Sequence, residues 1–538
     1  MLSYARGPAA PLLEKTVDEV LRETAARVPQ SDALISPHQK IRYTYAELDR
    51  QVERTARGLA GLGLVPGDRV GIWSTNCLEW ILVQLACARA GLVLVNVNPA
   101  YRSHELAFVL RKSRMRVLMV CAPDSRANRP QILEEASSTE KFALQHVVVL
   151  GTDSWDRMLA AGADLPAAPL SNREAVNIQY TSGTTGSPKG VLLTHRNIVN
   201  NGLLGARQLR VTERDRICVP VPLYHCFGCV IGTMVAITSG AAMILPAAQF
   251  DALATLEALE AERATVIYGV PTMFIAELEH PEFARFDLRS LRTGVMAGAP
   301  CPIEVMRRVV DEMHCSEMVI AYGQTESSPI ITMSSPDDPL EVRVSTIGRA
   351  IAETEVKIVS TISGETVPIG EPGELCARGH VVMQGYDDEP EATRRAIDGE
   401  GWLHTGDLAA MRPDGCLRIT GRAKDMIIRG GENVYPREVE EFLYTHPKIA
   451  EVQVVGLPDT KLGETVCAWI RLKGAETATE EEVRQFCSGK IAYYKIPQYI
   501  RFVDSFPTTV TGKVQKFKIR EFEIRARGLQ QAARVETA

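Results

Sequence analysis

The chain has 538 residues, a length that suggests about three or four structural units with large cores. Apolar residues make up 45% and charged residues 23%, which excludes disorder as its main state. The 60 Lys and Arg side chains are balanced by 66 Asp and Glu, so the net charge is −6. Because a nucleic-acid binder needs a positive surplus, this balance predicts no nucleic-acid partner and leaves small anionic ligands possible.

The first half of the chain alternates helical and strand patterns. Thr44 and Glu47 form a capping box that predicts a helix to about Leu62, and a Pro-Gly-Asp turn at 66–68 leads into a strand over 69–73. Further along, we expect helices over 77–90, after the N-cap Ser103 and over 251–262, and strands over 92–97, 117–121 and 265–268. This alternation is typical of βαβ units and parallel sheets.

Residues 217–250 contain no Asp, Glu, Lys or Arg, a length that alone would permit a membrane span. Prolines and glycines interrupt the stretch at Pro220, Pro222, Gly228, Gly232, Gly240 and Pro246. We therefore predict a buried helix and strand, and no transmembrane segment.

The C-terminal part has a different pattern. A turn and strand over 414–420 ends the larger body. After it we expect a helix from Pro436, strands over 451–456 and 465–472, and a helix capped by Thr479 and Glu482. We predict an α/β protein with a large N-terminal body, residues 1–423, of mixed or parallel sheets flanked by helices. Residues 424–538 are expected to form a small α+β domain.

Twelve cysteines are scattered, several in apolar runs as at Cys77, Cys87, Cys121 and Cys467, the pattern of buried thiols in a reducing compartment. The N-terminal residues carry no apolar run long enough for a signal peptide, and the last residues match no peroxisomal or prenylation signal. We therefore expect a cytoplasmic protein.

The strongest motif runs from Thr181 to Gly190 between two apolar strands, 176–180 and 191–194. Three glycines and five hydroxyl side chains occur in these ten residues, together with Lys189. Glycines let backbone N–H groups converge on an anion, and hydroxyls and a lysine add donors and charge, so the motif predicts polyphosphate binding. It is not a Walker loop, because Pro188 replaces a required glycine and a strand follows. A second glycine pair, Gly61 and Gly63, lacks the third glycine of a dinucleotide fingerprint and is interpreted as a helix stop.

Residues 181–190 resemble the phosphate-binding signature of the adenylate-forming, or AMP-binding, superfamily, which includes acyl-CoA synthetases, luciferases and peptide-synthetase adenylation domains. Further segments resemble the family's other motifs in the same order: 322–326, 405–407, 421–425, 430–433 and 511–513. The resemblance extends from about Thr16 to Arg525. Within the acyl-CoA synthetases, segments 429–436, 495–497 and 512–518 look closest to the medium-chain fatty acid–CoA ligase branch.

The resemblance implies a fatty acid that attacks ATP to give acyl-AMP and pyrophosphate, and coenzyme A that then displaces AMP. It makes Lys513 the catalytic cation at the α-phosphate, Glu326 a catalytic residue and the ligand of Mg²⁺, and Tyr322 the adenine contact. Asp407 would bind the ribose hydroxyls, and Arg422 the ribose or phosphate. The other nucleotide-binding candidates are Thr181, Ser182, Gly183, Thr184, Thr185, Gly186, Lys189, Gly298, Ala299 and Thr325.

The resemblance also places an interdomain hinge at Lys424. Rotation of the C-terminal domain would withdraw Lys513 after adenylation and bring up Gly430 and Gly431, where small residues let a thin pantetheine arm pass close to the backbone.

His225 matches a family position beside the substrate carboxylate; the alternative is a core histidine. Cys226 and Cys229 form a Cys-x-x-Cys pair, but no second pair stands at metal-ligand spacing. Peptide-synthetase domains usually place Asp where Gly228 stands, to pair with the substrate amine. Since a buried ammonium without a partner is costly, we expect a neutral-tailed acid.

Three alternatives stay open. A fatty acyl-AMP ligase would make the same adenylate and deliver the acyl group to a carrier protein, which also presents pantetheine. A luciferase-like oxygenase would emit light from a luciferin. A silent nucleotide sensor would release no pyrophosphate with any acid.

Overall fold

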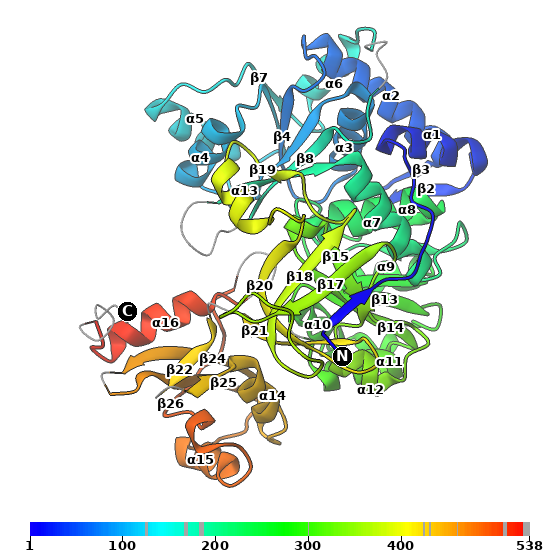
Figure 1. The fold of residues 1–538 in the computed structure, drawn as a ribbon. Coiled ribbons are helices and arrows are strands. Elements are labelled where there is room, and N and C mark those ends of the chain that lie inside the picture. Colours follow the sequence, from blue (N-terminus) through cyan, green and yellow to red (C-terminus); the bar gives the residue numbers. More distant parts are fainter. Residues whose placement is uncertain are drawn as a thin grey trace. The chain divides into compact units, whose positions relative to one another are not determined.

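The computed structural model describes residues 1–123, 127–165, 170–181, 188–299, 301–422, 425–429, 432–459, 461–508 and 514–530 (Figure 1). The chain forms two compact units. The larger consists of Ala5–Val356 and Ala377–His404, and the smaller of Met1–Tyr4, Lys357–Cys376 and Thr405–Ala538. The predicted hinge at Lys424 lies outside the described residues, so the 1–423 and 424–538 division stays a prediction.

One sheet of the larger unit has seven strands in the order β19-β9-β8-β5-β4-β6-β7. Its parallel strands are β4 (Arg69–Trp73), β5 (Val93–Asn96), β6 (Val117–Val120), β7 (His146–Val149) and β8 (Ala175–Thr181). At one edge, β9 (Lys189–Thr194) pairs antiparallel with β8, and β19 (Gly385–Tyr386) pairs antiparallel with β9. The neighbouring helices are α2 (Tyr45–Gly61), α3 (Leu78–Ala90), α4 (Ser103–Ser113), α5 (Arg129–Thr139) and α6 (Asp153–Ala160).

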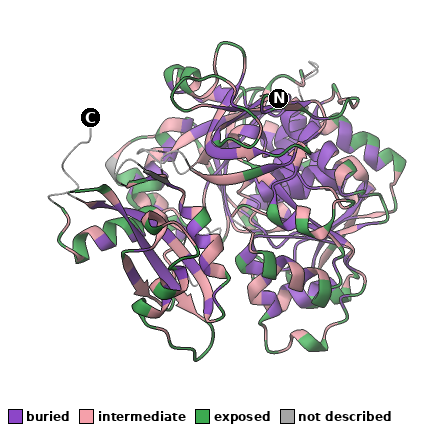
Figure 2. Cartoon of the chain, turned by 60° about the horizontal axis from the view of Figure 1, so that its bottom comes forward, coloured by how far each residue is buried: buried purple, intermediate pink, exposed green. Residues whose placement is uncertain are grey.

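Helices cover both faces of this sheet because its parallel strands are apolar on both sides. On β6, Val117 and Met119 belong to the core shared with α2 and α3, whereas Leu118 and Val120 join a second core with α4 and α5. Side chains alternate between the two faces of a strand, so a nearly continuous apolar run serves both cores. Figure 2 shows how the buried residues concentrate on such strands and on the inner sides of helices.

The second sheet of the larger unit has nine strands in the order β16-β15-β14-β13-β12-β10-β11-β2-β3. The strands are β2 (Asp32–Ser36), β3 (Ile41–Thr44), β10 (Arg216–Cys218), β11 (Ala242–Ile244), β12 (Val266–Gly269), β13 (Thr293–Ala297), β14 (Glu317–Gly323), β15 (Ile330–Met333) and β16 (Arg349–Ala350). The strands from β14 to β2 along this order are parallel. At the edges, β3 pairs antiparallel with β2, β15 with β14, and β16 with β15.

A single core cluster joins the inner faces of both sheets. It includes Ile217 and Val266 from the nine-stranded sheet and Val70 and Ile72 from the seven-stranded sheet. The helices of this part of the unit are α1 (Val17–Arg27), α7 (His195–Gln208), α8 (Thr233–Ser239), α9 (Ala252–Ala261), α10 (Pro271–Leu278), α11 (Ile303–Glu312), α12 (Leu340–Ser345) and α13 (Pro390–Ala396). The α/β class is therefore confirmed.

A further sheet has the order β1-β17-β18-β20-β21. Its strands are β1 (Tyr4–Arg6), β17 (Thr354–Val359), β18 (Gly373–Gly379), β20 (Leu403–Met411) and β21 (Leu417–Arg422). The C-terminal sheet comprises β22 (Ile427–Arg429), β23 (Glu432–Val434), β24 (Ile449–Asp459), β25 (Gly463–Leu472) and β26 (Tyr499–Phe502), with helices α14 (Pro436–Tyr444), α15 (Glu480–Cys487) and α16 (Lys516–Ala526). Its two apolar cores, one with α14 and α15 and one with α16, match the α+β module expected from the sequence.

One predicted helix start and one predicted capping box need correction. The helix expected to be capped by Ser103 begins with Ser103 as its first residue, and Arg102 is the N-cap. At α15, Thr479 accepts a hydrogen bond from the Glu482 N–H as predicted, but the Glu482 carboxylate pairs with Lys448, 2.8 Å away, so only half of the capping box forms. The capping box is incomplete because the Lys448 ammonium competes for the Glu482 carboxylate.

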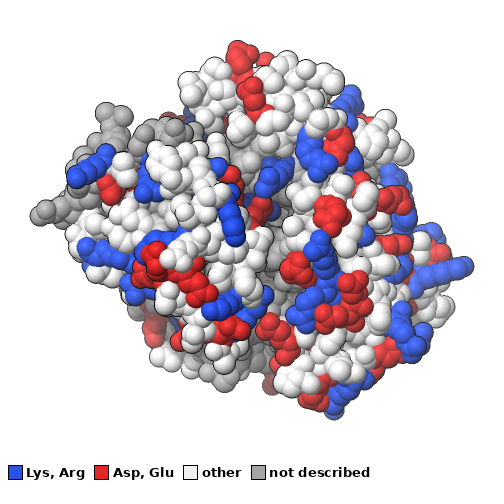
Figure 3. Space-filling view, turned by 90° about the horizontal axis from the view of Figure 1, so that it is seen from below, with Lys and Arg blue, Asp and Glu red and all other residues white. Residues whose placement is uncertain are grey.

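The uncharged stretch forms β10, a π-helical turn over Phe227–Gly232, the seven-residue helix α8 and β11. Across the described ranges, no helix has the length and apolar content needed to cross a membrane. On the face drawn in Figure 3, basic and acidic side chains lie interspersed.

Candidate active site

The phosphate motif lies between two strands, as the sequence predicts, and the structure pairs these strands antiparallel. β8 ends at Thr181, β9 begins at Lys189, and these two residues face each other across the ladder. The Thr181 hydroxyl donates to the Lys189 carbonyl at 3.4 Å. Ser182, Gly183, Thr184, Thr185 and Gly186 lie outside the described residues, so the hairpin fixes the two ends of the loop at the end of a central strand.

Lys189 and Glu326 are connected through a residue that the sequence did not single out. The Lys189 Nζ lies 4.9 Å from the centroid of the Tyr386 ring, and the Tyr386 hydroxyl donates to Glu326 Oε1 at 2.9 Å. A cation over the ring face and a carboxylate on the hydroxyl are both favourable contacts for tyrosine. Burial, and secondarily the Glu326 carboxylate, raises the Tyr386 pKa, so this hydroxyl stays a donor at neutral pH.

Tyr386 is held in place through its neighbour. The Arg69 guanidinium binds both oxygens of Asp387, at 2.7 and 2.8 Å, and the Asp387 N–H donates to the Gly190 carbonyl at 2.8 Å. Strand β19, which carries Tyr386, is thereby fixed against β9. A bidentate, largely buried pair of this kind specifies geometry more strongly than an exposed pair.

The adenine candidates lie at the carboxyl ends of adjacent parallel strands. Ala297 is the last residue of β13 and pairs with Ala321 of β14, so Gly298 follows one strand where Tyr322 stands on the next. Gly298 has φ of +83°, a left-handed conformation that side chains other than glycine adopt at a cost. Ala299 follows it. Ligands of open α/β sheets bind at such carboxyl ends, which supports the predicted grouping.

His225 precedes the π-helical turn, and its ring faces its own backbone. The Phe227 N–H donates to His225 Nδ1 at 3.3 Å, so Nδ1 is an acceptor and the neutral imidazole carries its proton on Nε2. The Cys226 Sγ lies 3.8 Å from the Thr325 hydroxyl, which links this segment to the short turn that contains Glu326. Burial raises the pKa of the Cys229 thiol, which disfavours the thiolate needed for a metal site.

Asp407 belongs to the smaller unit. It lies on β20, is buried, and stands opposite Arg422 of β21 in an antiparallel pair. The Thr405 hydroxyl donates to the Leu375 carbonyl at 2.6 Å and accepts from the Asp407 N–H at 3.1 Å, which fixes the start of this motif. Gly430, Gly431 and Lys513 lie outside the described residues, so their roles stay predictions.

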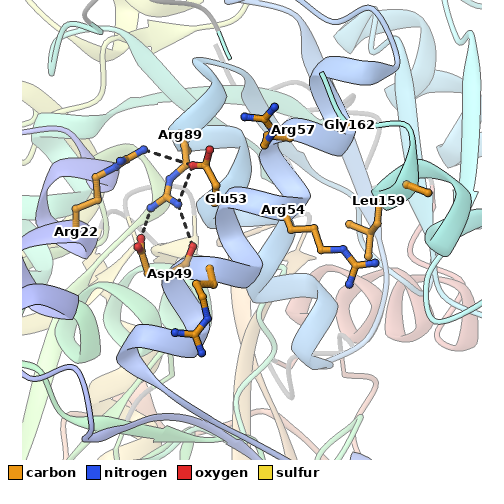
Figure 4. Close-up of a pocket in the computed structure, with 10 residues that line it drawn as sticks. Arg22, Asp49, Glu53, Arg54, Arg57, Arg89, Leu159 and Gly162 are labelled. Carbon is orange, nitrogen blue, oxygen red and sulfur yellow. Dashed lines mark hydrogen bonds and ion pairs between the residues drawn. The ribbon is translucent and has the colours of Figure 1, made fainter. Parts of the chain in front are cut away.

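A pocket of about 600 Å³ lies elsewhere in the larger unit, along α2 (Figure 4). Its central group is Arg89, whose side chain is 1% exposed and pairs with Asp18, Asp49 and Glu53. None of the predicted site residues within the described ranges lines it. The paired charges tie α1, α2 and α3 together and give the pocket a structural explanation.

Comparison with known proteins decides the family. Residues 21–387 match the family described as AMP-binding enzyme, and residues 438–513 match the AMP-binding enzyme C-terminal domain. This chain belongs to the AMP-binding enzyme family. The resemblance stated from the motifs, and the expectation of an acyl-CoA synthetase-type enzyme, are confirmed.

Relatives and solved structures agree along nearly the whole chain. The relative YngI of Bacillus subtilis is 47% identical, with 95% of this chain and 98% of YngI covered. The mitochondrial medium-chain acyl-CoA ligase ACSF2 of Rattus norvegicus is 43% identical, with 97% and 89% covered. The crystal structure of the anthranilate CoA ligase AuaEII in complex with anthranoyl-AMP has a TM-score of 0.87 at 29% identity, with 96% and 99% covered.

Proposed function

We propose that this chain is an ATP-dependent acid–thiol ligase that activates a medium-chain fatty acid as acyl-AMP and transfers the acyl group to coenzyme A. The observation that carries the proposal is the 43% identity, over 97% of this chain, to a relative named as a medium-chain acyl-CoA ligase. The acyl adenylate in the AuaEII structure supports the intermediate. That rat relative is named as mitochondrial, and a cytoplasmic location for this chain stays a prediction.

The neighbourhood of Gly228 supports an acid without an amino group. A Cβ atom built on Gly228 would lie 2.3 Å from the Pro222 carbonyl oxygen, so an aspartate could stand there only if the backbone moved. This packing supports the proposal that the segment lacks the amine partner found in peptide-synthetase domains. Apolar side chains of the same core follow: Val230, Ile231, Met234, Val270, Met273 and Ile330.

The chain's own groups suit the first half-reaction. The Nε2–H of His225 would donate to the substrate carboxylate, and Lys189 with the loop hydroxyls would bind polyphosphate. Lys513 would stabilise the charge that develops at the α-phosphate. In the second half-reaction, the pantetheine arm of coenzyme A would pass Gly430 and Gly431 after rotation of the domain about Lys424.

Glu326 fits a magnesium ion that is shared with the nucleotide. It offers a carboxylate oxygen, the ligand type that Mg²⁺ prefers, and in the described residues it belongs to no group of three clustered metal-ligand side chains. Phosphate oxygens and water would supply the other ligands, the usual pattern for Mg²⁺ at phosphate sites. The ion would neutralise negative charge on the polyphosphate.

A chain-length series tests the substrate class. AMP release is measured with ATP, coenzyme A and straight-chain acids from acetate to palmitate, with an aromatic acid and an amino acid as comparisons. Each buried methylene contributes about 0.8 kcal/mol, so two carbons should raise kcat/KM roughly tenfold up to a medium-chain maximum. A maximum at acetate or at the aromatic acid would contradict the substrate class. Thioester formation with a carrier protein but not with free coenzyme A would contradict the acceptor.

A further inference from the structure

Side-chain amides from other elements hold the segment that carries His225, here called the 221–229 segment. Asn76, in the turn after β4, donates from Nδ2 to the Val221 carbonyl at 3.0 Å and accepts from the Leu223 N–H at 2.8 Å. One amide thus pairs with two backbone groups, as a neighbouring strand would.

A second amide supports the π-helical turn. Gln84 lies on α3, a helix whose residues are nearly all buried. The Thr233 N–H, which would donate to the Cys229 carbonyl in an α-helix, donates to the Gly228 and Val230 carbonyls. Gln84 Nε2 supplies a donor to the Cys229 carbonyl at 2.8 Å.

The second polar atom of Gln84 argues for a specific need. Gln84 Oε1 is buried and has no hydrogen-bond partner in the described part of the chain. A buried amide that is only half satisfied costs free energy, and an apolar residue would suit this helix better on its own. The bond to the Cys229 carbonyl is therefore the contact that explains a glutamine at this position.

Two further amides contact the segment from the seven-stranded sheet. Asn96 Nδ2 donates to the Tyr224 carbonyl at 3.0 Å and to Cys229 Sγ at 3.5 Å, and Gln179 Nε2 donates to the same sulfur at 3.2 Å. Asn177 joins them, because it donates to Asn96 Oδ1 at 2.9 Å and accepts from Gln179 at 2.7 Å. The amides of Asn76, Gln84, Asn96 and Gln179 belong to residues at most 6% exposed.

We infer that Asn76, Gln84, Asn96 and Gln179 are positioning residues that set the place of His225 and Phe227 for the acid substrate. This inference rests on the proposed function of the 221–229 segment. Phe227 lies in the π-helical turn. Its N–H selects the His225 tautomer, and the centroid of its ring is 5.8 Å from the centroid of the Tyr268 ring. A change from π-helical to α-helical register would rotate these groups by about 100° around the helix axis.

Gln84→Leu is the most direct test, because it removes one donor and leaves α3 apolar. Asn200→Leu is the matched control. Asn200 is a fully buried amide of the same unit, and its hydrogen bonds go to the Leu13 and Arg196 backbone, away from the segment. Hydrogen exchange of peptides covering 221–233 is measured for both variants, together with the KM for decanoate and for ATP.

In Gln84→Leu, amide exchange over 221–233 should be about tenfold faster and the KM for decanoate about tenfold higher, with the KM for ATP unchanged. In Asn200→Leu, the amide exchange over 221–233 and the KM for decanoate should match the wild type, although thermal stability falls. Equal exchange in the two variants, or a parallel rise in both KM values, would overturn the inference. If the wild type activates no acid, the proposed function fails, while the exchange comparison still decides whether the amides hold the segment.

Discussion

Tyr386→Phe separates the two contacts of the tyrosine between Lys189 and Glu326. The substitution keeps the ring 4.9 Å from the Lys189 Nζ and removes the hydroxyl that donates to Glu326 at 2.9 Å. A hydrogen bond to a charged group contributes about 1.5–3 kcal/mol, and the half-buried position favours the lower value. We therefore expect kcat/KM for acid-dependent ATP–pyrophosphate exchange to fall about tenfold.

Two further variants make this prediction specific. Tyr45→Phe also removes a tyrosine hydroxyl, one that donates to the Ala236 and Ala241 carbonyls, so it should lower stability and leave exchange unchanged. In a Glu326→Gln background, Tyr386→Phe should cost much less than tenfold, because the charged acceptor is already gone. Wild-type exchange in Tyr386→Phe, or full additivity of the two substitutions, would refute the coupling.

Two other predictions follow from the structure, and a third follows from the family resemblance. Glu277 is fully buried, neither carboxyl oxygen has a partner among the described residues, and burial raises its pKa well above the ordinary value. Above about pH 4.5 the folded protein therefore keeps a proton that the unfolded protein loses, so the free energy of unfolding falls as pH rises, by up to about 1.4 kcal/mol per pH unit. Glu277→Leu removes this loss and should raise Tm more at pH 8 than at pH 6. An equal rise in Tm at the two pH values would contradict this. Arg89→Met leaves the Asp18 and Asp49 carboxylates without their guanidinium and should destabilise the protein by about 2–3 kcal/mol, measured by thermal unfolding. The control Arg54→Met, at the rim of the same pocket, should cost at most about 0.5 kcal/mol. Lys513→Ala should slow pyrophosphate release about 10²–10³-fold and leave thioester formation from supplied acyl-AMP largely intact, and equal losses in both steps would remove its assigned role.

Local interactions made much of the fold predictable from the sequence. The capping box of Thr44 and Glu47 forms as expected, and α2 ends at Gly61 because glycines and a proline follow. Strand β4 has the predicted bounds, and the phosphate motif lies between two strands. In each case the signal and the structure it specifies lie within a few residues of each other.

The missed residues depend on long-range contacts. Tyr386 reaches Glu326, 60 residues earlier, only because β19 pairs with β9, and no spacing rule connects them. Gln84 and Glu277 lie in buried helices, where pattern analysis expects apolar residues, so their burial is visible only in the folded chain. Arg102 replaced the expected cap Ser103 by a shift of one residue, the usual uncertainty of helix ends.

The central claim is that the chain joins an acid to coenzyme A through an acyl adenylate, and isotope transfer tests it most directly. Decanoate labelled with ¹⁸O in both carboxylate oxygens is incubated with the full chain, ATP, Mg²⁺ and coenzyme A, and the products are analysed by mass spectrometry. Attack of the carboxylate on the α-phosphorus predicts one ¹⁸O in each AMP, unlabelled pyrophosphate, and decanoyl-CoA in a one-to-one ratio with AMP. Unlabelled AMP, or label in inorganic phosphate with ADP as the nucleotide product, would contradict the account.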